Sequence, residues 1–153
     1  MLTTLRSLRL LALIVWLGGL IFFGAVMAHV AFHVLPTKQL AGAVVGGSLR
    51  NLHIIGMVCG AVLIATTLLL SRGRRMWVFT GITAAMLALT AYSQFSILPR
   101  MDADRAAASE ITRDCTSAPC TDFNRLHPLS VRVEEAVMVG GLALVVMLAQ
   151  REE

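Results

Sequence analysis

The sequence predicts an all-α polytopic membrane protein in which residues 1–153 form a single four-helix transmembrane bundle. Composition favours this class, because 57% of the residues are hydrophobic and 14% are charged, against about 25% charged residues in soluble domains. The apolar residues also stand in long uninterrupted blocks, which excludes a disordered chain and a sandwich of short strands. Lipid offers the backbone no hydrogen-bonding partner, so blocks of this length are expected to cross the bilayer as helices.

Three blocks are free of charged residues and long enough to span. Residues 10–28 nearly cross a hydrocarbon core of about 30 Å at a rise of about 1.5 Å per residue. Residues 54–70 follow a helical-looking run from Leu40, and residues 76–99 carry polar groups near one end, where an interface tolerates them. With a fourth block added, the predicted spans are 10–34, 40–71, 76–98 and 123–149, and an extracytoplasmic loop is predicted at 100–122.

The fourth block, residues 128–149, is uncharged only from Ala136 onward. Its first two turns carry Arg132, Glu134 and Glu135. Ionisable side chains at membrane depth are costly unless they are paired or face the interior of the bundle. The block is therefore predicted to span on the condition that these charges lie at its rim or are paired inside the bundle.

Basic residues near the span ends predict the orientation. Arg6 and Arg9 precede the first span and the tight turn SRGRR at residues 71–75 follows the second, whereas the basic residues of the long polar loop are scattered among acids. This pattern predicts a multi-pass protein of the inner (plasma) membrane with both termini in the cytoplasm. An alternative for the first block is a cleaved signal peptide, since Arg6 and Arg9 precede an apolar run that ends in small residues.

The polar loop contains Cys115 and Cys120 in the stretch CTSAPC. In an oxidising compartment two thiols this close can form a small disulfide that holds the loop, so these residues are disulfide candidates. A metal or redox pair is the alternative, although a CxxC spacing is absent and no histidine lies between the two cysteines.

Under this topology all four histidines, His29, His33, His53 and His127, lie at the extracytoplasmic end of the bundle. His29 and His33 are four residues apart and share one helical face. His53 opens the second span and aligns with a GxxxG match that favours close helix contact. His127 opens the fourth span, with Glu134 about two turns beneath it.

Imidazoles that converge from three helices predict a binding site in the outer leaflet for haem b, copper or zinc. The predicted ligands are His29, His33, His53 and His127, and Glu134 would hold one ring by a hydrogen bond without touching the metal. Two alternatives stay open. The histidines could belong to a proton path with Glu134 and Glu135, or each could be an interfacial polar residue bonded to a carbonyl or a lipid phosphate.

Other functions are weighed against this one. The sequence contains no nucleophile with a base in a known motif, no phosphate loop and no HExxH, so an enzyme is not favoured. A non-catalytic accessory bundle could pack against a larger membrane complex, or against a second copy, through small residues. These are Gly18, Gly19, Gly56, Gly60, Gly140 and Gly141. A small transporter is disfavoured because the chain shows no repeated halves.

The charge pattern separates the expected partners. The formal net charge is +4, but the basic residues sit at the ends of apolar blocks and form no stripe with interleaved aromatic residues. This distribution argues against nucleic acid as a partner. The lipid bilayer is the expected partner, with other membrane proteins as further candidates.

Four short stretches resemble the transmembrane protein 205-like family. They are FHVLPTKQLAG from Phe32 to Gly42, the LHIIGMVCG run at His53, SILPR ending at Arg100, and FNRLHPLS from Phe123 to Ser130. The chain departs from the family pattern at Pro128, where glycine is common, and at His33, where a basic residue is typical. The resemblance implies a four-helix membrane protein without an assigned reaction, in which His53, His127 and Ser130 are candidate positions.

Overall fold

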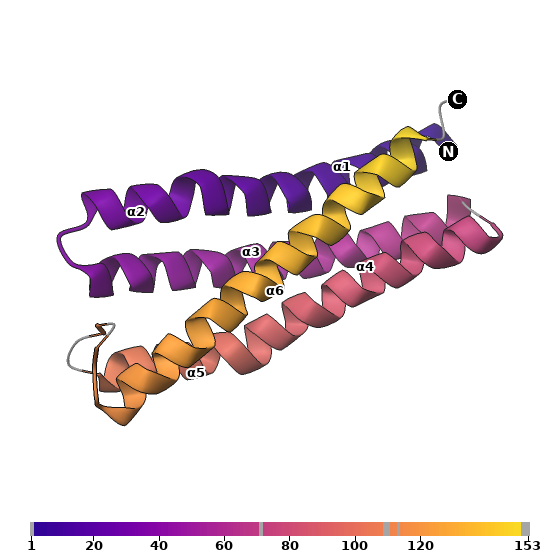
Figure 1. Ribbon diagram of the computed structural model, residues 1–153. Coiled ribbons are helices and arrows are strands. Elements are labelled where there is room, and N and C mark those ends of the chain that lie inside the picture. Colours follow the sequence, from indigo (N-terminus) through magenta and orange to yellow (C-terminus); the bar gives the residue numbers. More distant parts are fainter. Residues whose placement is uncertain (1, 71, 109–110, 113, 151–153) are drawn as a thin grey trace.

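The computed structural model describes residues 2–70, 72–108, 111–112 and 114–150. Within these residues all regular structure is helical, as predicted, and the helices join end to end into four rods (Figure 1). The first rod is α1 (Leu2–Phe22), the π-helical turn η1 (Phe23–Met27) and α2 (Ala28–Val34); the second is α3 (Lys38–Leu70); the third is α4 (Arg74–Tyr92), the π-helical turn η2 (Ser93–Ile97) and α5 (Leu98–Ala107); the fourth is α6 (Ala118–Ala149).

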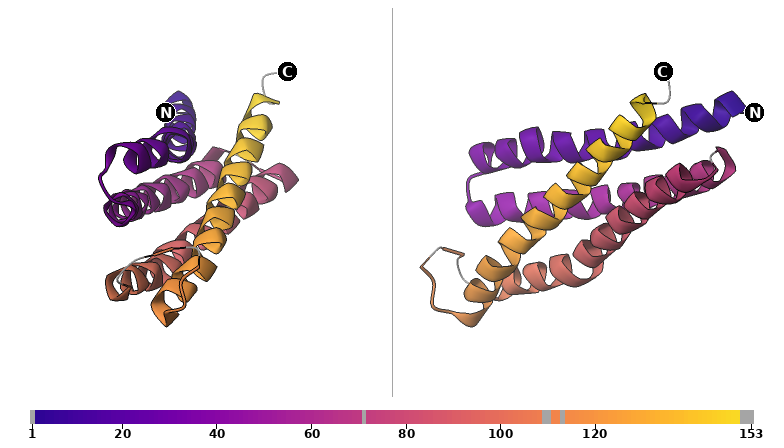
Figure 2. Two further views of the ribbon diagram at one scale, coloured as in Figure 1. Left: turned by 60° about the vertical axis from the view of Figure 1, so that its left-hand side comes forward. Right: turned by 45° about the vertical axis from the view of Figure 1, so that its right-hand side comes forward.

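The rods run up and down along one long direction, and α6 crosses the others at an angle (Figure 2). The start of α1, the turn from α3 to α4 and the end of α6 lie together at one end of the molecule, here called the terminus end (Figure 1). The turn from α2 to α3 and the connection from α5 to α6 lie at the opposite end, here called the loop end (Figure 1). The terminus end carries Arg6, Arg9, Arg72, Arg74 and Arg75.

Three rods of the described chain are long and apolar enough to cross a membrane: Leu2–Val34, Lys38–Leu70 and Arg74–Ala107. Their outward faces carry large apolar side chains that no other part of the chain covers, such as Val58, Leu69 and Phe95. Surfaces of this kind are suited to lipid and would be exceptional in water. The chain is therefore a multi-pass membrane protein. The fourth rod, α6, is not among these three, because Arg132, Glu134 and Glu135 interrupt its apolar sequence.

The helices extend further toward the loop end than the predicted spans. The loop expected at 100–122 is shorter, because α5 continues to Ala107 and α6 begins at Ala118, which leaves residues 108–117 as the connection. The charged residues after Leu98 were interpreted as the end of a helix, whereas they mark only the end of its apolar part. Pro119 lies in the first turn of α6, where the missing N–H of proline costs little.

Glycines let the rods approach closely inside the molecule. A Cβ built on Gly56 of α3 would lie 2.5 Å from Nε1 of Trp16 on α1, and one on Gly140 of α6 would lie 2.8 Å from Cγ of Met86 on α4. Trp16 is 1% exposed and packs in the main apolar core with Leu63. The small residues that suggested contact with a partner are thus largely used between helices of this chain.

Candidate functional site

The structure places the four predicted histidines in three separate positions. His29 and His33 are exposed on α2 with stacked rings 6.4 Å apart, and His127 on α6 stacks on Phe123 at 5.9 Å. His53 lies alone on α3 with 1% of its surface exposed. The part of the chain that the structure describes contains no group of three or more His, Cys, Asp or Glu side chains that could hold a metal ion.

His53 lies inside its helix, at the start of the apolar block. The sequence predicted a helical run from Leu40 ahead of it, and α3 begins at Lys38, so His53 lies about four turns into the helix. The helix includes residues on the N-terminal side of the apolar block, and these residues are less apolar than the block. His53 therefore faces the interior of the bundle between α3, η2 and α6, where its side chain is fully enclosed.

Both ring nitrogens of His53 meet an oxygen. Nδ1 lies 3.1 Å from Oε1 of Gln94 on η2, and Nε2 lies 2.8 Å from Oε1 of Glu134 on α6. An imidazolium satisfies both contacts, because it donates from each nitrogen, and it forms an ion pair with the carboxylate. If the Gln94 amide turns over, its NH₂ group donates to Nδ1 of a neutral ring, and Nε2 still donates to Glu134. The site can thus hold His53 with either one or two protons.

The carboxylate of Glu134 is only partly satisfied. Oε1 accepts from His53 and from the hydroxyl of Ser93, which lies 3.2 Å away. Oε2 is buried without a hydrogen-bonding partner in the described part of the chain. A buried carboxylate oxygen in that condition is costly, and the cost falls when a proton or a donor reaches it. The sequence aligned Glu134 with His127, whereas in the structure its carboxylate bonds to His53.

The π-helical turn η2 brings two consecutive side chains into the centre. Ser93 is fully buried and Gln94 is 9% exposed, although neighbouring residues of an α-helix point about 100° apart. In η2 the N–H of Leu98 bonds to the carbonyl of Ser93, five residues back, which widens the turn. Pro99 follows directly, and it can donate no N–H to an α-helical ladder. Single π turns of this kind occur frequently at functional sites.

Ser93 and Gln94 are the site residues that the sequence analysis missed. They were interpreted as polar groups at the end of a span, where an interface tolerates them. The available signal was the sequence YSQ inside an otherwise apolar block, a few residues before Pro99. That signal does not reveal a widened turn, so the inward direction of both side chains could not be foreseen.

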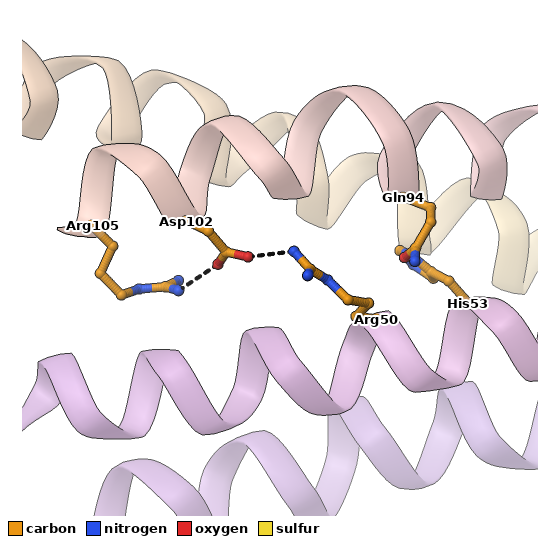
Figure 3. A network of polar contacts seen from close by, with 5 residues as sticks. All are labelled: Arg50, His53, Gln94, Asp102 and Arg105. Carbon is orange, nitrogen blue, oxygen red and sulfur yellow. Dashed lines mark hydrogen bonds and ion pairs between the residues drawn. The ribbon is translucent and has the colours of Figure 1, made fainter. Parts of the chain in front are cut away.

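A second polar network lies about one turn closer to the loop end (Figure 3). Asp102 on α5 accepts from Arg50 on α3 at 2.6 Å and from Arg105 at 2.9 Å. The guanidinium of Arg105 lies over the ring of Phe123 on α6, 5.2 Å from the ring centroid. The side-chain amide of Gln39 donates to the backbone carbonyl of Arg105 at 3.3 Å. Arg50 thus joins α3 to α5 through Asp102.

Toward the terminus end the polar centre is closed by apolar packing. Gly56 follows His53 by about one turn and lies against Trp16, and Val137 follows Glu134 and is fully buried. Leu63 and Met86 complete the same apolar core. Two buried threonines, Thr83 and Thr90, lie on α4 on either side of Met86, so this packing is mainly apolar but includes hydroxyl groups.

At the loop end Cys115 and Cys120 form a disulfide with their Cα atoms 6.1 Å apart. The amide of Asn124 donates to the carbonyl of Thr112 at 2.8 Å, which holds the connection against the first turns of α6. The disulfide thus fastens the segment that leads into the helix carrying Glu134.

The family comparison gives one match. A model described as a domain of unknown function, DUF4149, matches residues 11–109, which include α3, η2 and most of the first rod. The matched region contains His53, Ser93, Gln94 and Asp102, and Glu134 lies beyond it. Comparisons with curated proteins and with solved structures give no match.

Proposed function

Because the chain belongs to the DUF4149 family, a family of membrane-type domains, we propose that it is a four-span membrane protein that takes up and releases a proton at His53. The observation that carries this proposal is the pair of oxygens at the two ring nitrogens, 3.1 Å and 2.8 Å away. Reversal of the Gln94 amide accommodates the loss of one proton without moving a helix.

The fourth span is supported by the position of its charges. The sequence allowed α6 to cross only if its charged residues lie at the rim or are paired inside the bundle. Glu134 is paired with His53 in the interior, and fourteen apolar residues from Ala136 to Ala149 follow it. The remaining free-energy cost of a spanning α6 comes from Arg132 and Glu135, which are exposed near the level of His53.

Two independent features support a location in the inner membrane with both termini in the cytoplasm. Disulfides persist in oxidising compartments, and Cys115–Cys120 lies at the loop end. Arginines favour the cytoplasmic side, and Arg6, Arg74 and Arg75 lie at the terminus end. In this orientation the His53 centre lies on the extracytoplasmic side of the Trp16 packing.

The apolar core favours proton binding over proton transport. A proton that crosses the bilayer needs a continuous series of polar groups or waters. Toward the terminus end, His53 is followed mainly by apolar packing of Trp16, Leu63 and Val137, in which isolated hydroxyls such as that of Thr83 are buried. Protonation of His53 strengthens its bond to Glu134, and so it strengthens the contact between α3 and α6. We infer that the centre adjusts this contact in response to extracytoplasmic pH.

Nitrogen-15 NMR of histidine-labelled protein in lipid nanodiscs tests the proposal. The His53 signals, assigned with His53→Gln, are expected to change between acidic and alkaline pH, from two N–H groups to one. Glu134→Gln should lower the fraction of doubly protonated rings at a given pH, whereas Glu135→Gln on the exposed face should not. A His53 ring with one unchanging protonation state over this range would refute proton uptake at this site.

Haem b, copper or zinc at His29, His33, His53 and His127, with Glu134 bonded to one ring, stays a prediction. Ligation by His53 would require its ring to give up Gln94 or Glu134, since both nitrogens already meet an oxygen. A visible spectrum and a metal analysis of the purified protein test it, and a Soret band or stoichiometric metal would support it.

The resemblance to the transmembrane protein 205-like family also makes His53, the residue of the proposed proton site, a candidate position. Of its candidate positions, His53 and Ser130 are both buried, whereas His127 is exposed.

An accessory role in a larger membrane complex is the alternative function. Recovery of a stoichiometric partner from gently solubilised membranes would favour it.

A further inference from the structure

A groove of about 400 Å³ lies between α3 and α5, on the loop-end side of His53. Its walls carry the guanidinium groups of Arg50 and Arg105 and the carboxylate of Asp102. We propose that this groove binds the phosphate group of an anionic ligand, carried by a phospholipid headgroup or by free phosphate. The inference concerns other side chains than the proton site, and it holds whether or not His53 titrates.

Hydrogen-bond donors outnumber acceptors in the groove. Arg50 and Arg105 each present five N–H donors, and in the described part of the chain each directs one side-chain hydrogen bond to Asp102. The two oxygens of Asp102 are both used in these bonds. Two guanidinium groups against one carboxylate leave a positive charge and several unpaired donors. Planar guanidinium donors match the oxygens of phosphate in pairs, which a lysine does not achieve.

The floor of the groove leaves room beside the arginines. Gly47 and Ala43 of α3 line it, and Gly46 lies beneath Arg105, where an added Cβ would be 3.3 Å from the guanidinium NH1. The side chains of Arg50 and Asp102 are 45% and 41% exposed, so a ligand can reach them from outside. Arg105 is 12% exposed, whereas a Cβ on Gly47 would meet no atom within 4 Å, so a phosphate can reach Arg50 first without displacing packed residues.

The depth of the groove suits a headgroup. Arg50 precedes the apolar run that begins at Ile54 by about one turn, or about 6 Å along the helix. Asp102 follows the apolar end of the third rod at Leu98 by a similar distance. If the apolar core of the bilayer ends at Ile54 of α3 and at Leu98 of α5 on this side, both residues lie at the level of the phosphates of the extracytoplasmic leaflet.

Asp102→Asn separates ligand binding from a merely structural role of the network. Asparagine removes the charge that competes for both guanidinium groups, so a phosphate is expected to bind several-fold more tightly. If the network served only to join α3 to α5, the same change would weaken that contact and leave phosphate affinity unchanged.

The test uses the full chain in detergent, titrated with phosphatidylglycerol and phosphatidylcholine by native mass spectrometry and with inorganic phosphate by thermal shift. Arg50→Gln is expected to reduce affinity for the anionic ligand about tenfold, the usual effect of losing one charged hydrogen-bonding partner. Arg100→Gln is the matched control, because it removes an exposed arginine of α5, the other helix beside the groove, that does not line the groove.

The outcomes distinguish the two sources of phosphate. Binding of phosphatidylglycerol that depends on Arg50 identifies a lipid headgroup, and binding of inorganic phosphate alone that depends on Arg50 identifies a free anion. If Arg50→Gln and Arg100→Gln bind both ligands equally, or if Asp102→Asn fails to raise affinity for either, the inference is wrong.

Discussion

The pair of His53 and Glu134 shows how a charge can be kept inside a membrane bundle. The two side chains are 1% and 16% exposed, so each would be costly without the other. Glu134→Ala is expected to destabilise the protein by about 3 to 5 kcal/mol, because His53 loses its partner in the interior. The double change of both residues to leucine is expected to cost much less than the sum of the two single changes.

Unfolding in mixed micelles measures this coupling. Glu135→Ala, on the exposed face beside Glu134, serves as the control and is expected to stay within about 0.5 kcal/mol of the parent. Additive single and double changes would show that His53 and Glu134 do not interact energetically.

At the same scale, the residues of the site were partly visible in the sequence. The histidine and the carboxylate could be named, because ionisable groups next to apolar blocks are conspicuous. Their pairing could not, because it depends on how α6 crosses α3. Ser93 and Gln94 could not be recognised, since nothing in the local sequence gives the direction of a side chain in a widened helical turn.

Among the elements, α1 and α3 depend on a close contact that glycine alone allows. Gly56→Ala would place a Cβ 2.5 Å from Nε1 of Trp16, a rigid and buried ring, so we expect a loss of about 1 to 3 kcal/mol. Gly18→Ala on α1 meets nothing within 4 Å and should stabilise its helix by up to about 1 kcal/mol. Thermal unfolding that ranks the two variants in the opposite order would contradict this packing.

The turn η2 is the second element on which the site depends. A π turn accommodates one extra residue, so deleting the exposed Phe95 should restore a regular helix in which Ser93 and Gln94 no longer both point into the centre. We expect the His53 NMR signals to change as they do in Gln94→Leu. Deletion of Gly24 shortens η1, which does not contact the site, and is the control. An unchanged His53 environment after loss of Phe95 would show that η2 does not position Gln94.

The element boundaries show what hydropathy can and cannot predict. Each apolar stretch lies inside a helical rod, and the second rod begins at Lys38, close to the predicted start at residue 40. The extension of α5 to Ala107 was missed, since a helix that leaves the lipid continues as long as its side chains pair, as Asp102 and Arg105 do. Hydropathy marks where lipid contact ends, and capping or pairing marks where the helix ends.

For the whole molecule, the decisive question is whether α6 crosses the membrane with the other three rods. A guanidinium N–H of Arg75, at the start of α4, donates to the carbonyl of Met147, near the end of α6. Leu144 is fully buried in the core that Trp16 and Phe79 share. The end of α6 is thus fixed beside the start of α1 and of α4. If the first three rods cross the bilayer, α6 has to cross it alongside them, because it follows them from the loop end to the terminus end (Figure 1).

Reporter fusions test this arrangement directly. Green fluorescent protein fused after residue 150 is expected to fluoresce, which requires a cytoplasmic location, whereas alkaline phosphatase inserted near residue 112 is expected to be active, which requires an oxidising compartment. Cys115 and Cys120 should resist a membrane-impermeant maleimide until a reductant opens their disulfide. With three spans, the carboxyl terminus would lie on the side of the loop and the fluorescent fusion would be dark. That result would place Glu134 in water and would remove the physical reason for its pairing with His53.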